Sequence, residues 1–167
     1  MITKEEKAEF YRRLDVVLNY LQQQNIQHQQ IMVVGSGALM TCGIPLETAP
    51  HDVDLEVCCD RIGEKVFKAL ADLCGNTFYQ IKEDYPKEWK HKPYIFAIPD
   101  PAEGKDAIVV NVWVVDKFSR DDDEIVWSHG VKFATAYGVL YHKAKYKRLK
   151  DVKDITSVAT TFLELLK

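Results

Sequence analysis

The chain has 167 residues, of which 47% are hydrophobic and 28% charged, and its formal net charge is −3. This composition excludes a disordered chain, a collagen-like repeat and a small disulfide-dense scaffold. The mild net charge argues against a protein whose whole surface binds nucleic acid. The length is typical of one domain with an ordinary hydrophobic core, so we expect a single domain over residues 1–167.

The N-terminal segment and the cysteines indicate a reduced, cytoplasmic protein. Charged residues stand where a signal peptide would need an apolar run, and no apolar stretch reaches the length of a membrane span. We therefore expect no membrane association. The cysteines form no Cys-x-x-Cys pair, and we interpret them as small buried residues rather than metal ligands. They are Cys42, Cys58, Cys59 and Cys74.

The first half of the chain is predicted to alternate helices with strands. Thr3 and Glu6 have the spacing of a capping box, and the apolar residues after them recur with a helical period. A short apolar run ends in Gly-Ser-Gly at 35–37, which is typical of a buried strand that enters a tight turn. Farther on, polar and apolar residues alternate as in a half-buried strand. We expect helices over about 3–24, 38–42 and 62–74, and strands over 31–34 and 51–57.

The second half is predicted to contain strands and then helices. The strands are expected near 77–82, 94–99, 107–115 and 125–133, with a hairpin loop at 101–105 and an acidic surface loop at 121–124. From about residue 135 the pattern is helical, in two pieces that meet near 150–151. This order predicts an α/β (α+β) fold, in which helices flank a mixed β-sheet and residues 135–167 form a helical C-terminal extension.

Two aspartates on the strand at 51–57 are the first candidate site residues. Because side chains alternate along a strand, Asp52 and Asp54 project from the same face, whereas Val53 and Leu55 enter the core. Two such charges about 6–7 Å apart repel each other by roughly 2.5 kcal/mol at an effective dielectric constant of 20. A divalent cation would relieve the repulsion, and carboxylate oxygens suit Mg²⁺ or Mn²⁺. For an isolated Asp-x-Asp, a solvated strand face is the more common interpretation.

The glycine turn that precedes these aspartates has two interpretations: an anion site, or a tight turn in which glycine only supplies a positive φ angle, which is the more common one for such a turn alone. A turn that leads into a helix leaves backbone N–H groups free to bind an anion, which makes Gly35 and Ser36 candidates. A Walker loop would need Gly-Lys-Ser/Thr, which is absent. A dinucleotide fingerprint would need a small residue where Met40 stands, although Glu56 has the spacing of its ribose-binding acid. A Rossmann-type dinucleotide binder is therefore a minor alternative.

Two motifs carry a resemblance to a known family. Gly-Ser at 35–36, followed by Asp-hydrophobic-Asp-hydrophobic at 52–55, resembles the signature of the nucleotidyltransferase (DNA polymerase β-like) superfamily, and residues 44–48 are similar to a stretch of its small bacterial branches. Lys143, followed by Lys-Asp-Val-Lys-Asp at 150–154, resembles a pattern of aminoglycoside-nucleotidyltransferase-like and abortive-infection-toxin-like members. The matches together span residues 31–157.

The resemblance implies a nucleotidyltransferase fold and a metal-dependent transfer of a nucleotide from a nucleoside triphosphate to a hydroxyl acceptor. In this interpretation, Gly35, Ser36 and Lys143 would bind the nucleotide. Asp52 and Asp54 would be the catalytic residues and would bind two Mg²⁺ (or Mn²⁺) ions. The acceptor, which the resemblance does not specify, stays open.

One position departs from the family pattern. The family places a third carboxylate on a neighbouring strand, and in the matching run at 108–113 this position is Asn111. An amide can coordinate a cation through its oxygen, but it contributes no charge and cannot act as a base. Glu56, on the strand face of the two aspartates, is the first candidate substitute, with Asp106 and Asp116 as others. The alternative function is therefore a catalytically inactive nucleotidyltransferase-fold protein that binds a partner or regulates it.

The remaining polar and aromatic candidates have weaker signals. The segment 143–153 is basic, which leaves nucleic acid open as a partner, with a solvated helix face as the equally weighted alternative. Asp151 and Asp154 are interpreted as helix-start and packing residues. His51 is interpreted as a structural residue, with a contact to substrate or a role as a base as the alternative. Three tryptophans are expected to pack in the core or between sheet and helix, with stacking on a base as the alternative: Trp89, Trp113 and Trp127.

Overall fold

The computed structural model describes residues 1–58, 60–75, 78–80, 93–115, 125–146 and 151–167. The helices are α1 (Lys4–Gln23), the 3-10 turn η1 (His28–Gln30), α2 (Gly35–Thr41), α3 (Asp60–Leu73), α4 (Ala136–Tyr146) and α5 (Asp151–Leu165). The strands are β1 (Ile31–Val33), β2 (Val53–Cys58), β3 (Phe78–Gln80), β4 (Tyr94–Ile98), β5 (Ile108–Val115), β6 (Ile125–Ser128) and β7 (Val131–Ala134).

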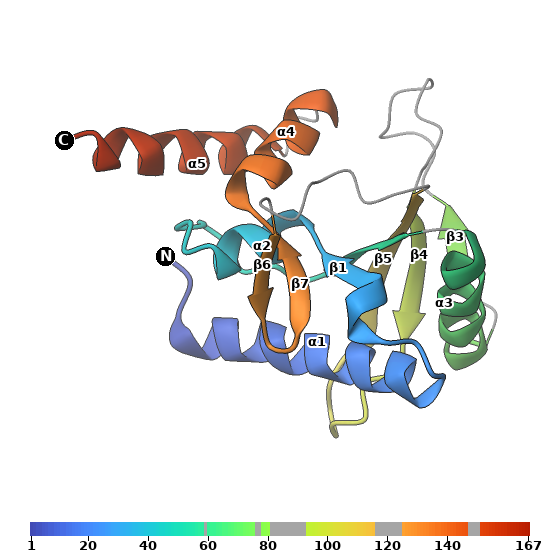
Figure 1. The fold of residues 1–167 in the computed structure, drawn as a ribbon. Coiled ribbons are helices and arrows are strands. Elements are labelled where there is room, and N and C mark those ends of the chain that lie inside the picture. Colours follow the sequence, from blue (N-terminus) through green and yellow to red (C-terminus); the bar gives the residue numbers. More distant parts are fainter. Residues whose placement is uncertain (59, 76–77, 81–92, 116–124, 147–150) are drawn as a thin grey trace.

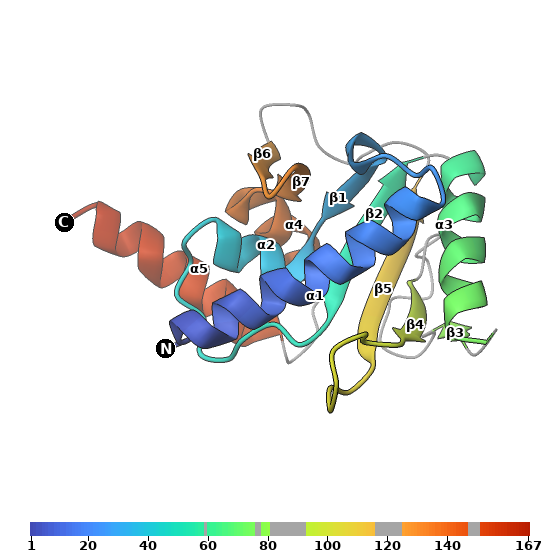
Figure 2. The same cartoon turned by 90° about the horizontal axis from the view of Figure 1, so that it is seen from below.

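A mixed seven-stranded sheet in the order β3-β4-β5-β2-β1-β7-β6 lies at the centre of the fold. The pairs β2–β5 and β1–β7 are parallel, and the other neighbouring pairs are antiparallel. Helices α1 and α3 contact each other and pack on β2, whereas α2 and α4 lie against each other near β7 (Figures 1 and 2). In both views α5 extends away from the sheet. The α/β (α+β) class with a mixed sheet and C-terminal helices is therefore confirmed.

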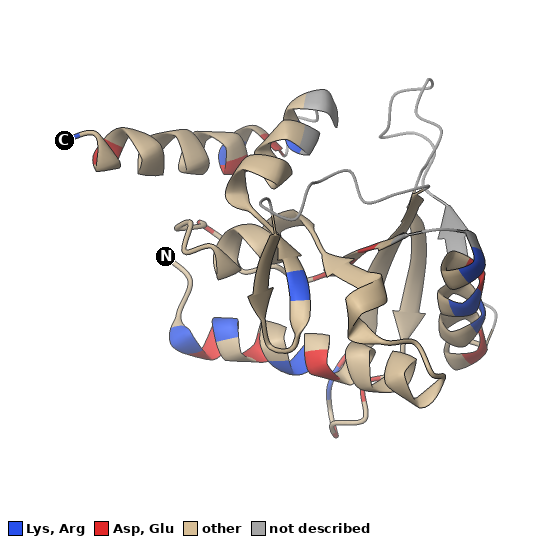
Figure 3. Cartoon of the chain, in the orientation of Figure 1, with Lys and Arg blue, Asp and Glu red and all other residues tan. Residues whose placement is uncertain are grey.

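Helix α1 is held on the sheet by the apolar stripe that the sequence predicts. The capping box is present, because the Glu6 backbone N–H donates to Thr3 Oγ1 at 3.1 Å and the Thr3 N–H donates to Glu6 Oε2 at 2.8 Å. Burial of one Leu or Val side chain stabilises a fold by about 1.5–3 kcal/mol. The N-terminal part of the helix also carries charges of both signs (Figure 3). The buried stripe comprises Phe10, Leu14, Val17, Leu18 and Leu21.

Two elements differ from the sequence prediction. Helix α2 begins at Gly35 rather than at residue 38, so Gly-Ser-Gly forms the first helical turn. The segment 125–133, expected as one strand region, contains the hairpin β6–β7. Its turn residues His129 and Gly130 both have positive φ angles, 50° and 72°, which is the geometry of a type I′ turn. Since His is a rare residue there, the turn had no recognisable sequence signal.

Several predictions fall partly or wholly on residues outside those described. They concern the loop at 121–124, Asp116, Trp89, Cys59 and half of the strand at 77–82, of which β3 is described. The antiparallel pairing of β4 with β5 confirms the hairpin around residues 101–105. Among the helices that the structure describes, none combines the length and the apolar character that crossing a membrane requires.

Candidate functional site

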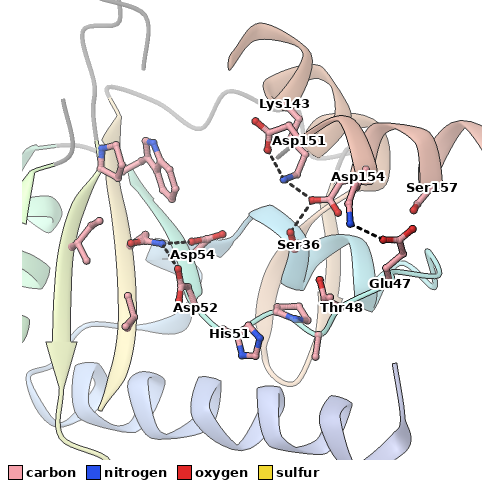
Figure 4. Close-up of a pocket in the computed structure, with 18 residues that line it drawn as sticks. Ser36, Glu47, Thr48, His51, Asp52, Asp54, Lys143, Asp151, Asp154 and Ser157 are labelled. Carbon is pink, nitrogen blue, oxygen red and sulfur yellow. Dashed lines mark hydrogen bonds and ion pairs between the residues drawn. The ribbon is translucent and has the colours of Figure 1, made fainter. Parts of the chain in front are cut away.

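A pocket of about 530 Å³ opens between the sheet and the two C-terminal helices (Figure 4). Residues of β2, β4, β5, α2, α4, α5 and the loop 47–52 line it, and its volume lies in the range of small-molecule sites. Figure 4 shows Asp52 and Asp54 on the sheet side and Lys143 and Asp154 on the helix side, with Ser36 between them. The charged lining residues are Glu47, Asp52, Asp54, Lys143, Asp151, Lys153 and Asp154.

Strands β2 and β5 place three polar side chains together on the sheet side. Asp54 and Asn111 are directly opposite each other in the parallel ladder of β2 and β5. The Asn111 Nδ2 donates a hydrogen bond of 2.7 Å to Asp54 Oδ1 and a longer one of 3.4 Å to Asp52 Oδ2. One amide group is thus shared by two carboxylates that face the same pocket.

The other end of the Asn111 amide is a buried acceptor. Its Oδ1 has no hydrogen-bond partner among the described residues. Leaving a buried polar atom unsatisfied costs about 1–3 kcal/mol. Two carboxylates and an amide oxygen without a partner have the hard-oxygen chemistry that Mg²⁺ or Mn²⁺ prefers, so these residues fit such an ion. Within the described part of the chain, no group of three or more His, Cys, Asp or Glu side chains is arranged to hold a metal.

Gly35 lies against Asp54, and any side chain at position 35 would meet the Asp54 carboxylate. Its φ angle is 68°, in the left-handed region that favours glycine. A Cβ atom at position 35 would overlap the Asp54 carboxylate. The preceding Val34 N–H donates to the Asp54 carbonyl oxygen at 2.9 Å. These contacts place the first turn of α2 directly beside the aspartate pair.

On the helix side, Lys143 links α4 to α5. Its ammonium nitrogen lies 3.0 Å from Asp151 Oδ1 and 2.8 Å from Asp154 Oδ2. Both Lys143 and Asp151 are buried. The Ser36 hydroxyl donates to Asp154 Oδ2 at 3.0 Å, so the cluster also reaches α2. Sequence reasoning treated Asp151 and Asp154 as packing residues and missed this cluster, although their spacing of three on a helix indicates a shared face.

Comparison with known proteins identifies the fold. No family model matches the chain, and no curated protein matches its sequence. JHP933 from Helicobacter pylori superposes with a TM-score of 0.57 and 13% identity, over 98% of this chain and 70% of that one. ANT(2")-Ia, in complex with adenylyl-2"-tobramycin, gives a TM-score of 0.54 and 10% identity, over 95% of this chain and 90% of that one. An antigenic nucleotidyltransferase-like protein from Paracoccidioides brasiliensis gives a TM-score of 0.50 and 17% identity, over 94% of this chain and 77% of that one.

This chain has the nucleotidyltransferase fold. The resemblance drawn from the Gly-Ser and Asp-x-Asp motifs is therefore confirmed at the level of the fold. At these identities the comparisons do not identify the residues that act, so the roles of individual side chains depend on the geometry of the pocket.

Within this nucleotidyltransferase fold, two of the candidate substitutes for a third carboxylate, Glu56 and Asp106, are outside the described residues that line the pocket. Glu56 is on β2 but is 5% exposed, and it is not among the described residues that line the pocket. Asp106 is exposed in the loop between β4 and β5 and is also outside the lining. Asp116 lies beyond the described residues. In this geometry, neither Glu56 nor Asp106 takes the place of the missing carboxylate.

The remaining candidates are distributed around the pocket and the sheet edge. His51 is exposed at the pocket, where its carbonyl oxygen accepts a 3.0 Å hydrogen bond from Arg13. Trp113 lines the pocket from β5. Trp127 is 56% exposed on β6, with Lys132 Nζ 5.6 Å from its ring centroid, so the expectation that it packs inside the fold is wrong.

In the basic segment 143–153 the structure describes two lysine side chains, and both contact carboxylates. Lys143 is held by the cluster above, and Lys153 Nζ lies 3.1 Å from Glu47 Oε2 in an exposed pair. The other basic side chains of the segment lie outside the described residues. A nucleic-acid partner for this segment stays a prediction.

Proposed function

We propose that this protein binds a nucleoside triphosphate together with Mg²⁺ or Mn²⁺ held by Asp52 and Asp54, and that it transfers the nucleotide to a hydroxyl acceptor. The observation that carries the proposal is the pair of aspartates in the pocket of a nucleotidyltransferase fold, where they share one amide donor. Transfer joins the acceptor oxygen to the α-phosphorus and breaks the bond to the β-phosphate. Pyrophosphate and a proton then leave.

The charge of the pocket supports a requirement for a cation. Among the described lining residues, five side chains are carboxylates and two are lysines. The lysines are already engaged by Asp151, Asp154 and Glu47. A triphosphate that entered alone would be repelled by the aspartate pair, because like charges at short range in a pocket are poorly screened. A bound divalent cation would offset part of this negative charge and would attract both the aspartates and the triphosphate.

The first turn of α2 supplies the proposed phosphate contacts. Gly35 and Ser36 hold the outer phosphates through backbone N–H groups, since the N-terminal turn of a helix leaves these donors free. The Ser36 hydroxyl, which donates to Asp154, keeps α2 against α5. Lys143, whose charge is balanced by Asp151 and Asp154, contributes to nucleotide binding indirectly, because it orients Ser36 through Asp154. The structure of ANT(2")-Ia with adenylyl-2"-tobramycin supports a nucleotide as the ligand class.

Asn111 favours a second candidate function, in which the protein binds the nucleotide without transferring it. The amide at this position contributes no charge and cannot accept the proton of an acceptor hydroxyl. Incubation with α-labelled triphosphates, followed by a search for labelled product, distinguishes the two functions, because only the transferase forms a product. In either function the acceptor or partner is unidentified, and the cytoplasmic location stays a prediction.

The proposal is tested by calorimetric titration with each of the four ribonucleoside triphosphates, in Mg²⁺ and in EDTA. We expect binding in Mg²⁺ only. We expect it to weaken by more than about tenfold in Asp52→Asn and Asp54→Asn, since each variant removes one charged ligand while keeping its shape. Asp106→Asn is the matched control, because Asp106 is an exposed carboxylate outside the pocket lining. Binding of equal strength in EDTA, or no binding of any nucleotide in Mg²⁺, would contradict the proposal.

A further inference from the structure

We infer that the pocket holds one divalent cation rather than two, and that Asn111 is the residue that sets this number. The inference rests on the proposed function and specifies the metal content of the same site. It follows from the charge of the residues around the aspartate pair and from the orientation of the Asn111 amide.

The first argument is electrostatic. Two divalent cations in one site, about 3.5–4 Å apart, repel with four times the energy of two unit charges at that distance. Asp52 and Asp54 supply two negative charges, which balance one such ion, so a second ion would depend on the triphosphate for its charge balance and its remaining ligands. The carboxylates on the helix side are held by lysines rather than directed toward the aspartate pair, because Asp151 and Asp154 both contact Lys143 and Glu47 contacts Lys153.

The second argument concerns the two ends of the Asn111 amide. Its Nδ2 donates to both carboxylates at 2.7 and 3.4 Å, so it holds the pair together in the absence of an ion. Its Oδ1 is buried with no hydrogen-bond partner among the described residues. Rotation of the amide would turn this oxygen toward an ion between the carboxylates and give it a ligand. The Asn111 amide can therefore contact the two aspartates when no ion is bound, and it can also supply a ligand to one ion.

An aspartate at position 111 would behave differently. It would place a third negative charge opposite Asp54, in the register that β2 and β5 fix. Without metal the three carboxylates would repel one another, and with metal they would attract a second ion. In the wild-type protein, a single ion held by Asp52 and Asp54 would accompany the triphosphate, and no second ion would be present to activate the acceptor hydroxyl. The inference therefore favours nucleotide binding over rapid transfer.

The test counts Mn²⁺ bound to the protein at saturation with a non-hydrolysable nucleoside triphosphate, by electron paramagnetic resonance. We expect one Mn²⁺ per wild-type chain, with the six-line spectrum of an isolated ion. We expect two in Asn111→Asp, with the broadened spectrum of an interacting pair. Asn19→Asp is the matched control, since it makes the same change on the exposed face of α1 and should bind one ion.

Each outcome decides the inference. Two ions in the wild-type protein would overturn it and leave the proposed function standing, whereas no ion at all would overturn both. One ion in Asn111→Asp would show that residue 111 does not set the number. Because three carboxylates could prevent Asn111→Asp from folding without metal, its thermal unfolding is compared in EDTA and in Mn²⁺. The variant should gain more stability from Mn²⁺ than the wild type, and an equal gain would also count against the inference.

Discussion

At the scale of single residues, Gly35 places the start of α2 against the proposed ion site. Its left-handed conformation starts α2, and its missing Cβ leaves space for the Asp54 carboxylate. Asn111 holds the same carboxylate from the opposite strand. Two uncharged residues, Gly35 and Asn111, therefore fix the position of the Asp54 carboxylate from two sides.

Gly35→Ala is expected to destabilise the protein and to weaken Mn²⁺ binding. The change costs about 1–2 kcal/mol for the left-handed backbone, and the overlap with Asp54 adds about 1–3 kcal/mol, as overpacking does. Gly43→Ala is the control, because Gly43 also has a positive φ, 82°, but nothing lies within 4 Å of its would-be Cβ. Urea unfolding and Mn²⁺ titration of both variants measure the difference. Equal losses of stability, with equal Mn²⁺ affinity, would contradict the assigned contact.

At the scale of elements, the buried cluster around Lys143 joins the C-terminal helices to α2. The helices α4 and α5 pack against each other, and α5 extends beyond the sheet (Figure 2). Asp151 has a side chain that is 1% exposed, and the Lys143 ammonium nitrogen lies 3.0 Å from its carboxylate. The exposed pair of Lys153 with Glu47 also joins α5 to the loop 47–52, but water screens it.

Lys143→Met is expected to lower the free energy of unfolding by about 3–5 kcal/mol, because it leaves two carboxylates together without their cation. Lys153→Met removes a charge of the same kind from an exposed pair and should cost about 0–1 kcal/mol. Chemical denaturation measures both variants. Hydrogen exchange along α5 should increase in Lys143→Met alone. Similar losses in the two variants would argue against a structural role for the buried cluster.

At the scale of the whole molecule, an ionic network connects α1 to the loop after β4. The Arg12 guanidinium donates to both carboxylate oxygens of Asp100, at 3.0 and 2.6 Å, and also to Glu9. Hydrogen bonding to Arg12 lowers the pKa of Glu9 to about 2 and also lowers the pKa of Asp100. The folded protein therefore takes up these protons less readily than the unfolded chain does.

The contribution of this network to stability should be complete above about pH 5 and should disappear as the pH falls toward 2, because the lowered pKa values belong to the folded state. The double variant Glu9→Gln/Asp100→Asn is expected to be less stable at pH 7 and to lose less stability between pH 5 and pH 2. Urea midpoints across this range measure the effect, with Asp15→Asn on the exposed face of α1 as the control. A double variant with the pH profile of the wild type would contradict the network's role.

Local patterns in the sequence predicted part of the site. Strand alternation placed Asp52 and Asp54 on one face, and the family pattern placed Asn111 on the neighbouring strand. The contact of Ser36 with Asp154 could not be predicted, because it joins residues 118 positions apart through the packing of α2 against the C-terminal helices. The contacts of Lys143 with Asp151 and Asp154 depend on the packing of α4 against α5, which sequence periodicity does not encode.

The most direct measurement for the central claim is the position of the ion itself. Crystals grown with Mn²⁺ and a non-hydrolysable triphosphate, measured at a wavelength where manganese scatters anomalously, would locate it independently of any activity. The account predicts an anomalous peak between the carboxylates of Asp52 and Asp54, with ligand distances of about 2 Å and phosphate oxygens on its pocket side. The account would be contradicted if the nucleotide bound with its metal elsewhere. It would also be contradicted if Asp52 and Asp54 kept their contacts with Asn111 and held no ion.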